Sequence, residues 1–366
     1  METVGARHRQ RAADPADPGD PPPAARQDPP RTAAARRRAR LLGVPAVLAL
    51  IVLLAMVSVA VGAKPIPLGT VFDAVLDPHG TTDEQLVRAL RLPRTGLGLV
   101  AGAALGVAGA LMQTLTRNPL ADPGILGVNA GASAAVVLAI GFAGLRTFTG
   151  YVWFALAGAA VVAALVHVLG AVGPGGATPT RLVLAGTAIA AALTALTSAV
   201  LLARPAVFDA FRFWTIGSVA GREASVLYQV TPFLVAGALI AAAVARPLDA
   251  LAIGDDGATA LGARVGLTRT LGVVAVTLLC GAVTAAVGPI GFVGLAVPHL
   301  ARVVSGPDHR WILFYSAGLG ALLLLAADVL GRVVASPGEL EVGIVTAFLG
   351  APALVVLTRR GRGRRS

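Results

Sequence analysis

The hydrophobic positions of this chain are gathered into long continuous blocks rather than spread as helical stripes or strand alternations. Blocks of about 20 apolar residues have the length of a helix that crosses a bilayer core of roughly 30 Å. The sequence therefore predicts an all-α membrane protein. We expect ten transmembrane helices, at residues 41–62, 95–115, 124–144, 151–172, 181–202, 226–245, 268–287, 290–304, 311–330 and 343–358.

The block at 290–304 is the weakest of the ten, because it is short and contains Pro298. We retain it because an odd number of spans would put the basic C-terminal residues on the opposite side of the membrane from the basic N-terminal ones.

The composition excludes a water-soluble globular enzyme. Of the 366 residues, 56% are hydrophobic and 13% are charged, and the mean hydropathy is +0.78. Soluble domains carry about 25% charged residues.

The chain has a formal net charge of +11, and every basic residue except Lys64 is an arginine. Nucleic-acid binding could explain this excess, but the positive-inside rule explains it without a polyanionic partner. With the N-terminus inside, the ten-span arrangement places 21 of the 30 Lys and Arg residues on the inner side and 9 on the outer side. We therefore expect a multi-pass protein of the cytoplasmic membrane with both termini in the cytoplasm and no nucleic-acid partner.

Residues 1–40 are rich in proline and charge and nearly devoid of large apolar side chains, which predicts a disordered cytoplasmic tail. The apolar block after this tail is too long for the central region of a signal peptide. The remaining divisions are a transmembrane domain at 41–358 and a second basic cytoplasmic tail at 359–366.

The sequence lacks the residues that three kinds of chemistry require, namely ATP binding, ion coupling and hydrolysis within the membrane. A P-loop needs Lys followed by Ser or Thr, but Lys64 is followed by Pro65. Ion coupling relies on carboxylates near the bilayer midplane, and the only acidic residue deep in a predicted span is Asp328, which Arg332 can pair four residues on. Membrane-embedded hydrolysis needs patterns such as His-Glu-x-x-His, which do not occur. These absences favour a transport pathway whose energy is supplied by another polypeptide.

The isolated cysteine and two histidines carry no predicted chemistry. Cys280 lies in an apolar run and is expected to be a small buried hydrophobe, with neither a disulfide nor a four-ligand zinc site. His167 and His299 have no acidic partner nearby in the sequence, so we expect His167 to be packed or to face a pore.

Five segments, taken in order, resemble the FecCD family, the permease subunits of type II ABC importers for ferric siderophores, haem and vitamin B12. The resemblance extends from roughly the first span to the C-terminus. The segments are RLPR at 91–94, RNPLADPGILG at 117–127, LAIGDD at 251–256 with ALG at 260–262, GPIGFVGLAVPH at 288–299, and Asp328 and Arg332 with GIVTAFLGAP at 343–352.

The resemblance implies the type II ABC importer permease fold and a set of partners. These are two cytoplasmic ABC ATPase subunits, a second permease subunit that is identical or homologous, and an extracytoplasmic substrate-binding protein. This chain would bind no cofactor, since ATP and Mg would lie on the partner ATPase. We expect import of an iron-siderophore, with haem and cobalamin as alternatives. An ion-coupled secondary transporter and a polytopic membrane enzyme are the alternatives from other classes.

The segment 248–266, called the coupling segment below, is mixed polar and apolar and follows Arg246-Pro247, which we expect to close a span. Two short amphipathic helices around a glycine turn would suit a groove on a partner. The resemblance implies that this segment is the element gripped by the ATPase, whereas the residues alone would also allow an ordinary interfacial loop. The candidate coupling residues are Leu248, Leu251, Ile253, Gly254, Asp255, Leu261 and Gly262.

Prolines break the chain at the expected inner ends of several spans. Asn118-Pro119 and Asp122-Pro123 leave backbone groups without helical partners, which is tolerated where irregular backbone lines a cavity. Residues 288–294 similarly predict a kinked or partly unwound segment. The resemblance implies that the first loop and the 178–180 loop border a cytoplasmic gate, although the second is equally consistent with a simple turn. The candidate path residues are Asn118, Pro119, Leu120, Thr178 and Thr180.

Three arginines on the expected outer face, Arg91, Arg94 and Arg332, run against the positive-inside trend. Arginines at span ends often extend to the interface, which is the simpler interpretation. The resemblance implies that they meet a glutamate on each lobe of the binding protein, with Asp328 orienting Arg332. A planar guanidinium suits this task because it binds a carboxylate with two parallel hydrogen bonds.

Overall fold

The computed structural model describes residues 30–62, 64, 66–76, 79–145, 147–172 and 178–362. Within these ranges all regular secondary structure is helical. The elements are α1 (Pro30–Ala60), α2 (Leu68–Leu76), α3 (Thr82–Leu86), the π-helical turn η1 (Val87–Arg91), α4 (Leu92–Leu115), the 3-10 turn η2 (Pro123–Leu126), α5 (Val128–Ala143), α6 (Phe148–Ala171), α7 (Pro179–Ala203), α8 (Pro205–Thr215), α9 (Ala224–Leu251), α10 (Asp255–Ala260), α11 (Val265–Val287), α12 (Val293–Ser305), α13 (His309–Val334) and α14 (Val342–Arg362).

Each of the ten predicted blocks coincides with a helix in the structure. Seven helices in the described ranges are long and apolar enough to cross a membrane: α1, the continuous helix Thr82–Leu115 that ends in α4, α6, α7, α9, α11 and α13. The other three blocks form shorter apolar helices, Val128–Ala143, Val293–Ser305 and Val342–Pro352. The all-helical fold is therefore confirmed, with seven full-length candidate spans.

The helices extend further than hydropathy alone indicates. Helix α1 begins at Pro30, within the segment assigned to the N-terminal tail, because the Ala- and Arg-rich residues 33–38 favour helix and proline suits the first helical position. Residues 1–29 of that predicted tail lie outside the described residues. At the other terminus α14 continues to Arg362, so residues 359–362 of the predicted C-terminal tail are helical, and residues 363–366 lie outside the described residues.

Three short helices, α2, α3 and α8, were not predicted, because each is too short to give a hydropathy block. Helix α2 is amphipathic and buries Val71 and Ala74. Helix α3 begins with a capping box, in which the Glu84 N–H donates to Thr81 Oγ1 at 3.3 Å and the Thr81 N–H donates to Glu84 Oε2 at 3.2 Å.

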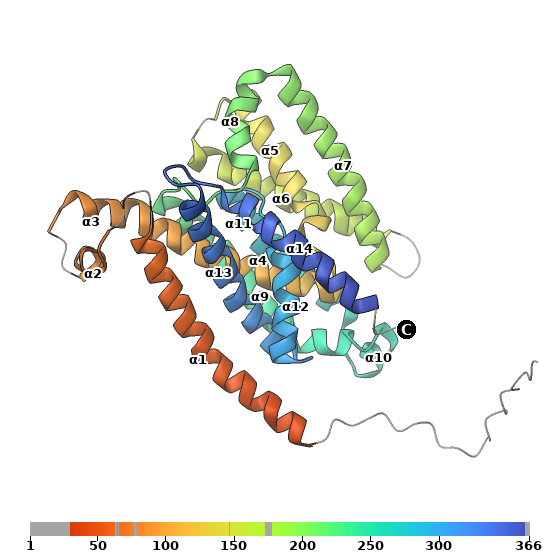
Figure 1. Cartoon of the computed structure of the whole chain (residues 1–366). Coiled ribbons are helices and arrows are strands. Elements are labelled where there is room, and N and C mark those ends of the chain that lie inside the picture. Colours follow the sequence, from red (N-terminus) through yellow and green to blue (C-terminus); the bar gives the residue numbers. More distant parts are fainter. Residues whose placement is uncertain are drawn as a thin grey trace, which may run out of the picture.

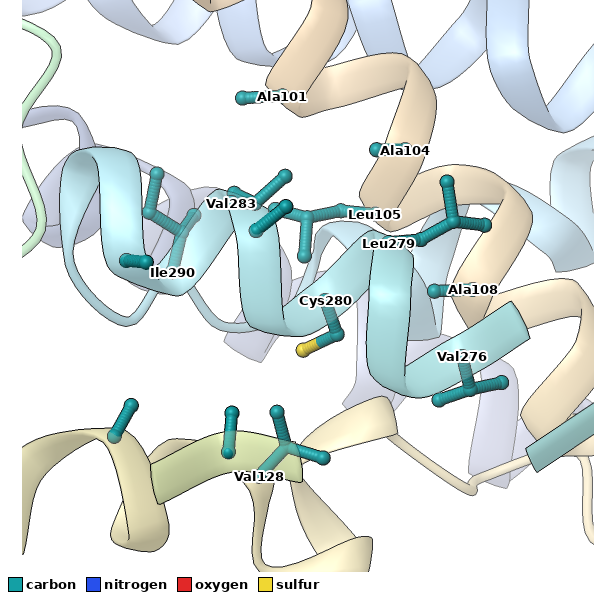
Figure 2. Packing of buried hydrophobic residues seen from close by; sticks show 14 of the residues in the cluster. Ala101, Ala104, Leu105, Ala108, Val128, Val276, Leu279, Cys280, Val283 and Ile290 are labelled. Carbon is teal, nitrogen blue, oxygen red and sulfur yellow. The ribbon is translucent and has the colours of Figure 1, made fainter. Parts of the chain in front are cut away.

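Helix α4 lies at the centre of the bundle and packs against α9, α11, α12 and α13. Figure 2 shows its small side chains facing α11, which places Cys280 in the interior with its sulfur directed toward the helix that carries Val128. Cys280 is 2% exposed, as predicted for a small buried hydrophobe. The α4 residues in this contact are Ala101, Ala104, Leu105 and Ala108, and those of α11 are Val276, Leu279 and Val283.

Glycines bring the backbone of α4 against its neighbours. A Cβ atom on Gly102 would lie less than 3.0 Å from the carbonyl oxygen of Gly320 in α13. A Cβ atom on Gly109 would meet the backbone of Gly294 in α12 equally closely. Helix α4 therefore contacts both helices backbone to backbone, as small residues permit in membrane bundles.

The weakest predicted span, α12, keeps its helical form through a side chain of α4. Pro298 has no N–H, so the carbonyl of Gly294, four residues earlier, lacks its helical partner. Gln113 Nε2 donates to this carbonyl at 3.3 Å and to that of Leu295 at 3.1 Å, and Arg302 Nη1 donates to Gln113 Oε1 at 2.5 Å. The irregular stretch before α12 is confirmed, since Phe292 has a positive φ of 67°.

The two ends of the bundle differ in the elements they carry. Helix α10, the start of α1 and the end of α14 lie toward one end, called the α10 end below, whereas α2 and α3 lie at the opposite end, called the α2 end (Figure 1).

Candidate functional site

The C-terminal end of α1, at the α2 end of the bundle, is capped by two arginines from other helices. Arg91 and Arg332 donate to four consecutive carbonyls at residues 58–61. Arg332 Nη1 donates to the carbonyls of residues 58 and 61 at 2.8 and 2.6 Å. Arg91 Nη1 donates to the carbonyls of residues 59 and 60 at 2.7 and 2.8 Å. The last carbonyls of a helix have no partner within it and carry partial negative charge, so cations stabilise this position.

A buried carboxylate joins this cap to Arg94. Asp328 is 1% exposed and lies 2.9 Å from Arg332 Nη2 through one oxygen and 2.9 Å from Arg94 Nη2 through the other. Arg94 Nη1 also pairs with Glu339 Oε2 at 2.7 Å. The predicted Asp328–Arg332 ion pair is confirmed and extends to a third and a fourth charge, as buried charges require partners.

The three predicted docking arginines therefore lie together but differ in what they can still bind. All five N–H groups of Arg332 already donate, to Asp328 and to residues 58 and 61. Arg91 is 7% exposed and donates to α1 and to the Lys64 carbonyl. Arg94 keeps one N–H group on each of Nη1 and Nη2 that could meet an added carboxylate.

These residues border a cavity of about 320 Å³ at the α2 end. Lys64, Arg91, Arg94 and Arg332 supply four positive charges to its lining, and Glu339 supplies one negative charge. An acidic side chain of a partner is the complementary occupant of such a cavity.

At the α10 end, the structure divides the predicted coupling residues into two groups. Leu248 and Leu251 are 0% and 1% exposed, so they belong to the core of this chain and cannot contact a partner. Ile253 and Leu261 are 70% and 68% exposed. The prediction that Leu248 and Leu251 face the ATPase is therefore wrong, because packing within the chain covers that face of the segment.

The prediction of two short helices in the coupling segment is also wrong. Helix α9 does not end at Pro247 but continues to Leu251, so α10 is the only separate helix of the coupling segment. Gly254 and Gly262, on either side of α10, have φ values of 120° and 78°, which only glycine adopts readily. Asp255 begins α10 and pairs with Arg117 and Arg269.

The predicted gate loop after α4 is exposed and held by its own polar side chains. Arg117 has a positive φ of 50°, Asn118 Oδ1 accepts from the Leu120 N–H at 2.9 Å, and Asp122 Oδ1 accepts from the Gly124 N–H at 2.8 Å. Asn118, Pro119 and Leu120 are all exposed. Desolvation in this loop raises the pKa of the Asp122 carboxyl, although the hydrogen bond from Gly124 opposes the shift.

The second predicted gate segment lies at the start of α7. Thr178 caps this helix by accepting from the Arg181 N–H at 3.4 Å, and Thr180 is exposed. The turn η2, which follows the first gate loop, packs on α7. The two segments thus border the same helix.

The exposed face of α7 carries hydroxyl groups that the sequence analysis did not single out. Thr187, Thr194 and Ser198 are exposed and are spaced by seven and four residues, so they lie on one face together with Ala191 and Ala195. Helix α7 lies at the edge of the bundle (Figure 1). Between the exposed Leu184 and Leu202, which lie on the same face, this stretch of small and hydroxyl-bearing residues suits contact with water better than contact with acyl chains. The spacing of seven and four residues between these hydroxyl-bearing residues was the sequence signal that could have identified this face.

No group of three or more His, Cys, Asp or Glu side chains suited to a metal ion occurs in the part of the chain that the structure describes. The arrangement offers instead a basic cavity at one end, an exposed apolar segment at the other, and a polar helix face between them.

Known proteins of one family are similar to this chain over most of its length. The model of the FecCD transport family matches residues 50–360. The ferric enterobactin transport system permease protein FepD of Escherichia coli (strain K12) is 48% identical over 322 residues, which are 88% of this chain and 96% of that protein. The hemin transport system permease protein HmuU of Yersinia pestis is 35% identical over 326 residues, 87% of this chain and 96% of that protein.

A solved structure described as an inward-facing conformation of a metal-chelate type ABC transporter is similar, with a TM-score of 0.75 and 26% identity. The match covers 86% of this chain and 98% of that one. Because the family model and these relatives span nearly the whole described bundle, the chain belongs to the FecCD transport family.

Proposed function

We propose that this chain is the membrane-spanning permease subunit of an ATP-driven importer for a ferric siderophore. The observation that carries this proposal is the nearly end-to-end similarity to the ferric enterobactin permease, which exceeds the similarity to the hemin permease over the same share of the chain. Haem is less favoured for this reason, and cobalamin is the other alternative.

The proposed topology has ten membrane crossings, with the α10 end in the cytoplasm. The three short apolar helices α5, α12 and α14 would complete the seven longer spans. The excess of arginine on the side assigned to the α10 end supports this orientation, which places the protein in the cytoplasmic membrane.

The energy would come from two ABC ATPase subunits that dock on the coupling segment. Ile253 and Leu261 support this assignment, because large apolar side chains exposed on a polar end of the bundle suit a groove on a partner. ATP and Mg would bind to those subunits, since the chain's only lysine, Lys64, is not followed by Ser or Thr.

A second permease subunit, identical or homologous, would complete the path. The hydroxyl face of α7 and the exposed Asn118, Pro119 and Leu120 support a path along α7, with the gate residues at its cytoplasmic end. Such a path needs a facing surface, because α7 is covered by other parts of the chain on one side only.

An extracytoplasmic binding protein would dock at the basic cavity. An incoming carboxylate would meet Arg94 and Lys64, which is exposed and paired with Asp83, because Arg91 and Arg332 are buried and hold the end of α1. Arg94→Ala should therefore weaken docking while leaving the α1 cap in place.

The test is uptake by the reconstituted complex of permease, ATPase and binding protein. Proteoliposomes containing ATP should accumulate radioactive iron supplied as the siderophore, and should take up haem and cobalamin far more slowly. Iron uptake driven by a proton gradient without the ATPase would refute the proposal and favour a secondary transporter.

A further inference from the structure

Two sets of polar contacts, called links below, connect the coupling segment to the C-terminal end of α4, and the first runs through Arg117. Asp255 Oδ1 lies 2.5 Å from Arg117 Nη2, and the same carboxylate accepts from Arg269 Nη2 at 2.9 and 3.0 Å. Arg117 Nη2 also donates to the carbonyl of Leu251, the last residue of α9, at 3.2 Å. One arginine, two residues after the end of α4, thus touches both arms of the turn that presents Ile253.

A second link, on the other side of this turn, reaches the last turn of α4 itself. Asp249 Oδ1 lies 2.6 Å from His309 Nδ1 and also accepts the His309 backbone N–H at 3.0 Å. Because the carboxylate can only accept, Nδ1 carries a proton and donates. The other ring nitrogen lies 3.0 Å from the hydroxyl of Thr114. Asp249 is therefore connected through one imidazole to α4 and to the first residue of α13.

The exposure of the side chains in the two links shows which of them are accessible and which are held in place. Asp255 and Arg117 are 43% and 41% exposed, and such ion pairs contribute little to stability because water screens them. The His309 side chain, which Asp249 contacts, is 7% exposed, and the Arg269 side chain, which Asp255 contacts, is 9% exposed, so both are fixed by packing. Asp249 and Asp255 are thus each joined to a buried side chain of the bundle.

A displacement of the coupling segment would be passed on beyond α4. Gly102 and Gly109 hold α4 backbone to backbone against α13 and α12, and Gln113 is bonded to the carbonyls of α12. Such close contacts do not absorb movement, because packed interiors have low compressibility.

We propose that Asp249 and Asp255 are positioning residues that transmit movement of the coupling segment to α4, through His309 with Thr114 and through Arg117. Two attachments on opposite sides of the turn prevent it from swivelling independently of α4. This inference rests on the proposed function, in which an ATPase moves the coupling segment.

The test compares ATP hydrolysis with substrate uptake in the same proteoliposomes of the complete complex. Arg117→Ala and Asp249→Ala each remove one link while leaving Ile253 and Leu261 exposed for the ATPase. For each variant, substrate taken up per ATP hydrolysed should fall by about tenfold, a size common for energetic coupling between sites. Arg117→Lys, which keeps the charge, should recover part of the loss, and Arg310→Ala, which removes an exposed arginine near the same end, should match the parent.

The outcomes separate this inference from the proposed function. Unchanged uptake per ATP in both variants would overturn the inference. So would loss of ATPase copurification in both, because the links would then only shape the docking surface. Absence of ATP-dependent uptake by the parent complex would instead refute the proposed function. A spin-label distance between α4 and the coupling segment that stays constant on ATP binding in the parent but changes in the variants would add direct support.

Discussion

Two apolar residues of the coupling segment, only two positions apart, should respond in opposite ways to substitution. Leu251 is 1% exposed, so Leu251→Ala would leave a cavity and lower the free energy of unfolding by about 2–5 kcal/mol. Ile253 is 70% exposed, so Ile253→Asp should change that free energy by less than about 0.5 kcal/mol.

Binding of the ATPase should show the reverse order. If Ile253 fills an apolar groove of the ATPase, Ile253→Asp should cost about 2 kcal/mol of binding free energy, which weakens the Kd roughly 30-fold. Leu251→Ala protein that remains folded should bind the ATPase nearly as the parent does. Ile253→Leu, which stays apolar, serves as the matched control and should retain affinity.

The assay pairs thermal unfolding of the purified permease with titration of the ATPase onto permease in nanodiscs. Our reasoning would be refuted if Ile253→Asp destabilised the permease as much as Leu251→Ala does while leaving the Kd unchanged. It would equally fail if Leu251→Ala left the unfolding temperature of the parent intact.

Three further predictions concern packing and charge. Arg332→Lys should lower the free energy of unfolding by about 2 kcal/mol, since an ammonium cannot reach α1 and Asp328 as a fork does; thermal unfolding equal to that of the parent would contradict the cap. Asp122→Asn should stabilise the protein most at alkaline pH, and this gain in the free energy of unfolding should shrink as the pH falls. The reason is that a raised pKa means that the folded state favours the protonated carboxyl. A gain in stability that grows in acid would contradict the raised pKa of Asp122. Gly109→Ala should disrupt the α4–α12 contact and reduce the yield of folded protein, whereas Gly69→Ala, where a Cβ meets open space, should be neutral in the same gel-filtration measurement.

The placement of the helices could be predicted from the sequence because apolar blocks of bilayer length depend on composition alone. The irregular stretch at 288–292 was also predictable, since its glycines and proline act locally. The burial of Leu251 beside the exposed Ile253 could not be predicted, because both are apolar and only the packing of α9 on its neighbours distinguishes them.

The arginines of the α2 end show the same limit. Their position at the ends of helices is visible in the sequence, but their direction depends on α1, α4 and α13 meeting at one point. The partner of Asp249 was equally hidden, because His309 is 60 residues away along the chain. Contacts of this kind require the tertiary structure.

The cap on α1 also constrains the order of events during biosynthesis. Helix α1 emerges from the ribosome before the two arginines that satisfy its last carbonyls, which belong to segments made about 30 and 270 residues later. Until Arg332 has been synthesised, the last turn of α1 must rely on water or lipid headgroups for its hydrogen bonds. Its firm attachment to the bundle is therefore a late step of assembly, and nascent chains arrested before α13 should retain an α1 that hydrophobic cross-linkers reach from the lipid side.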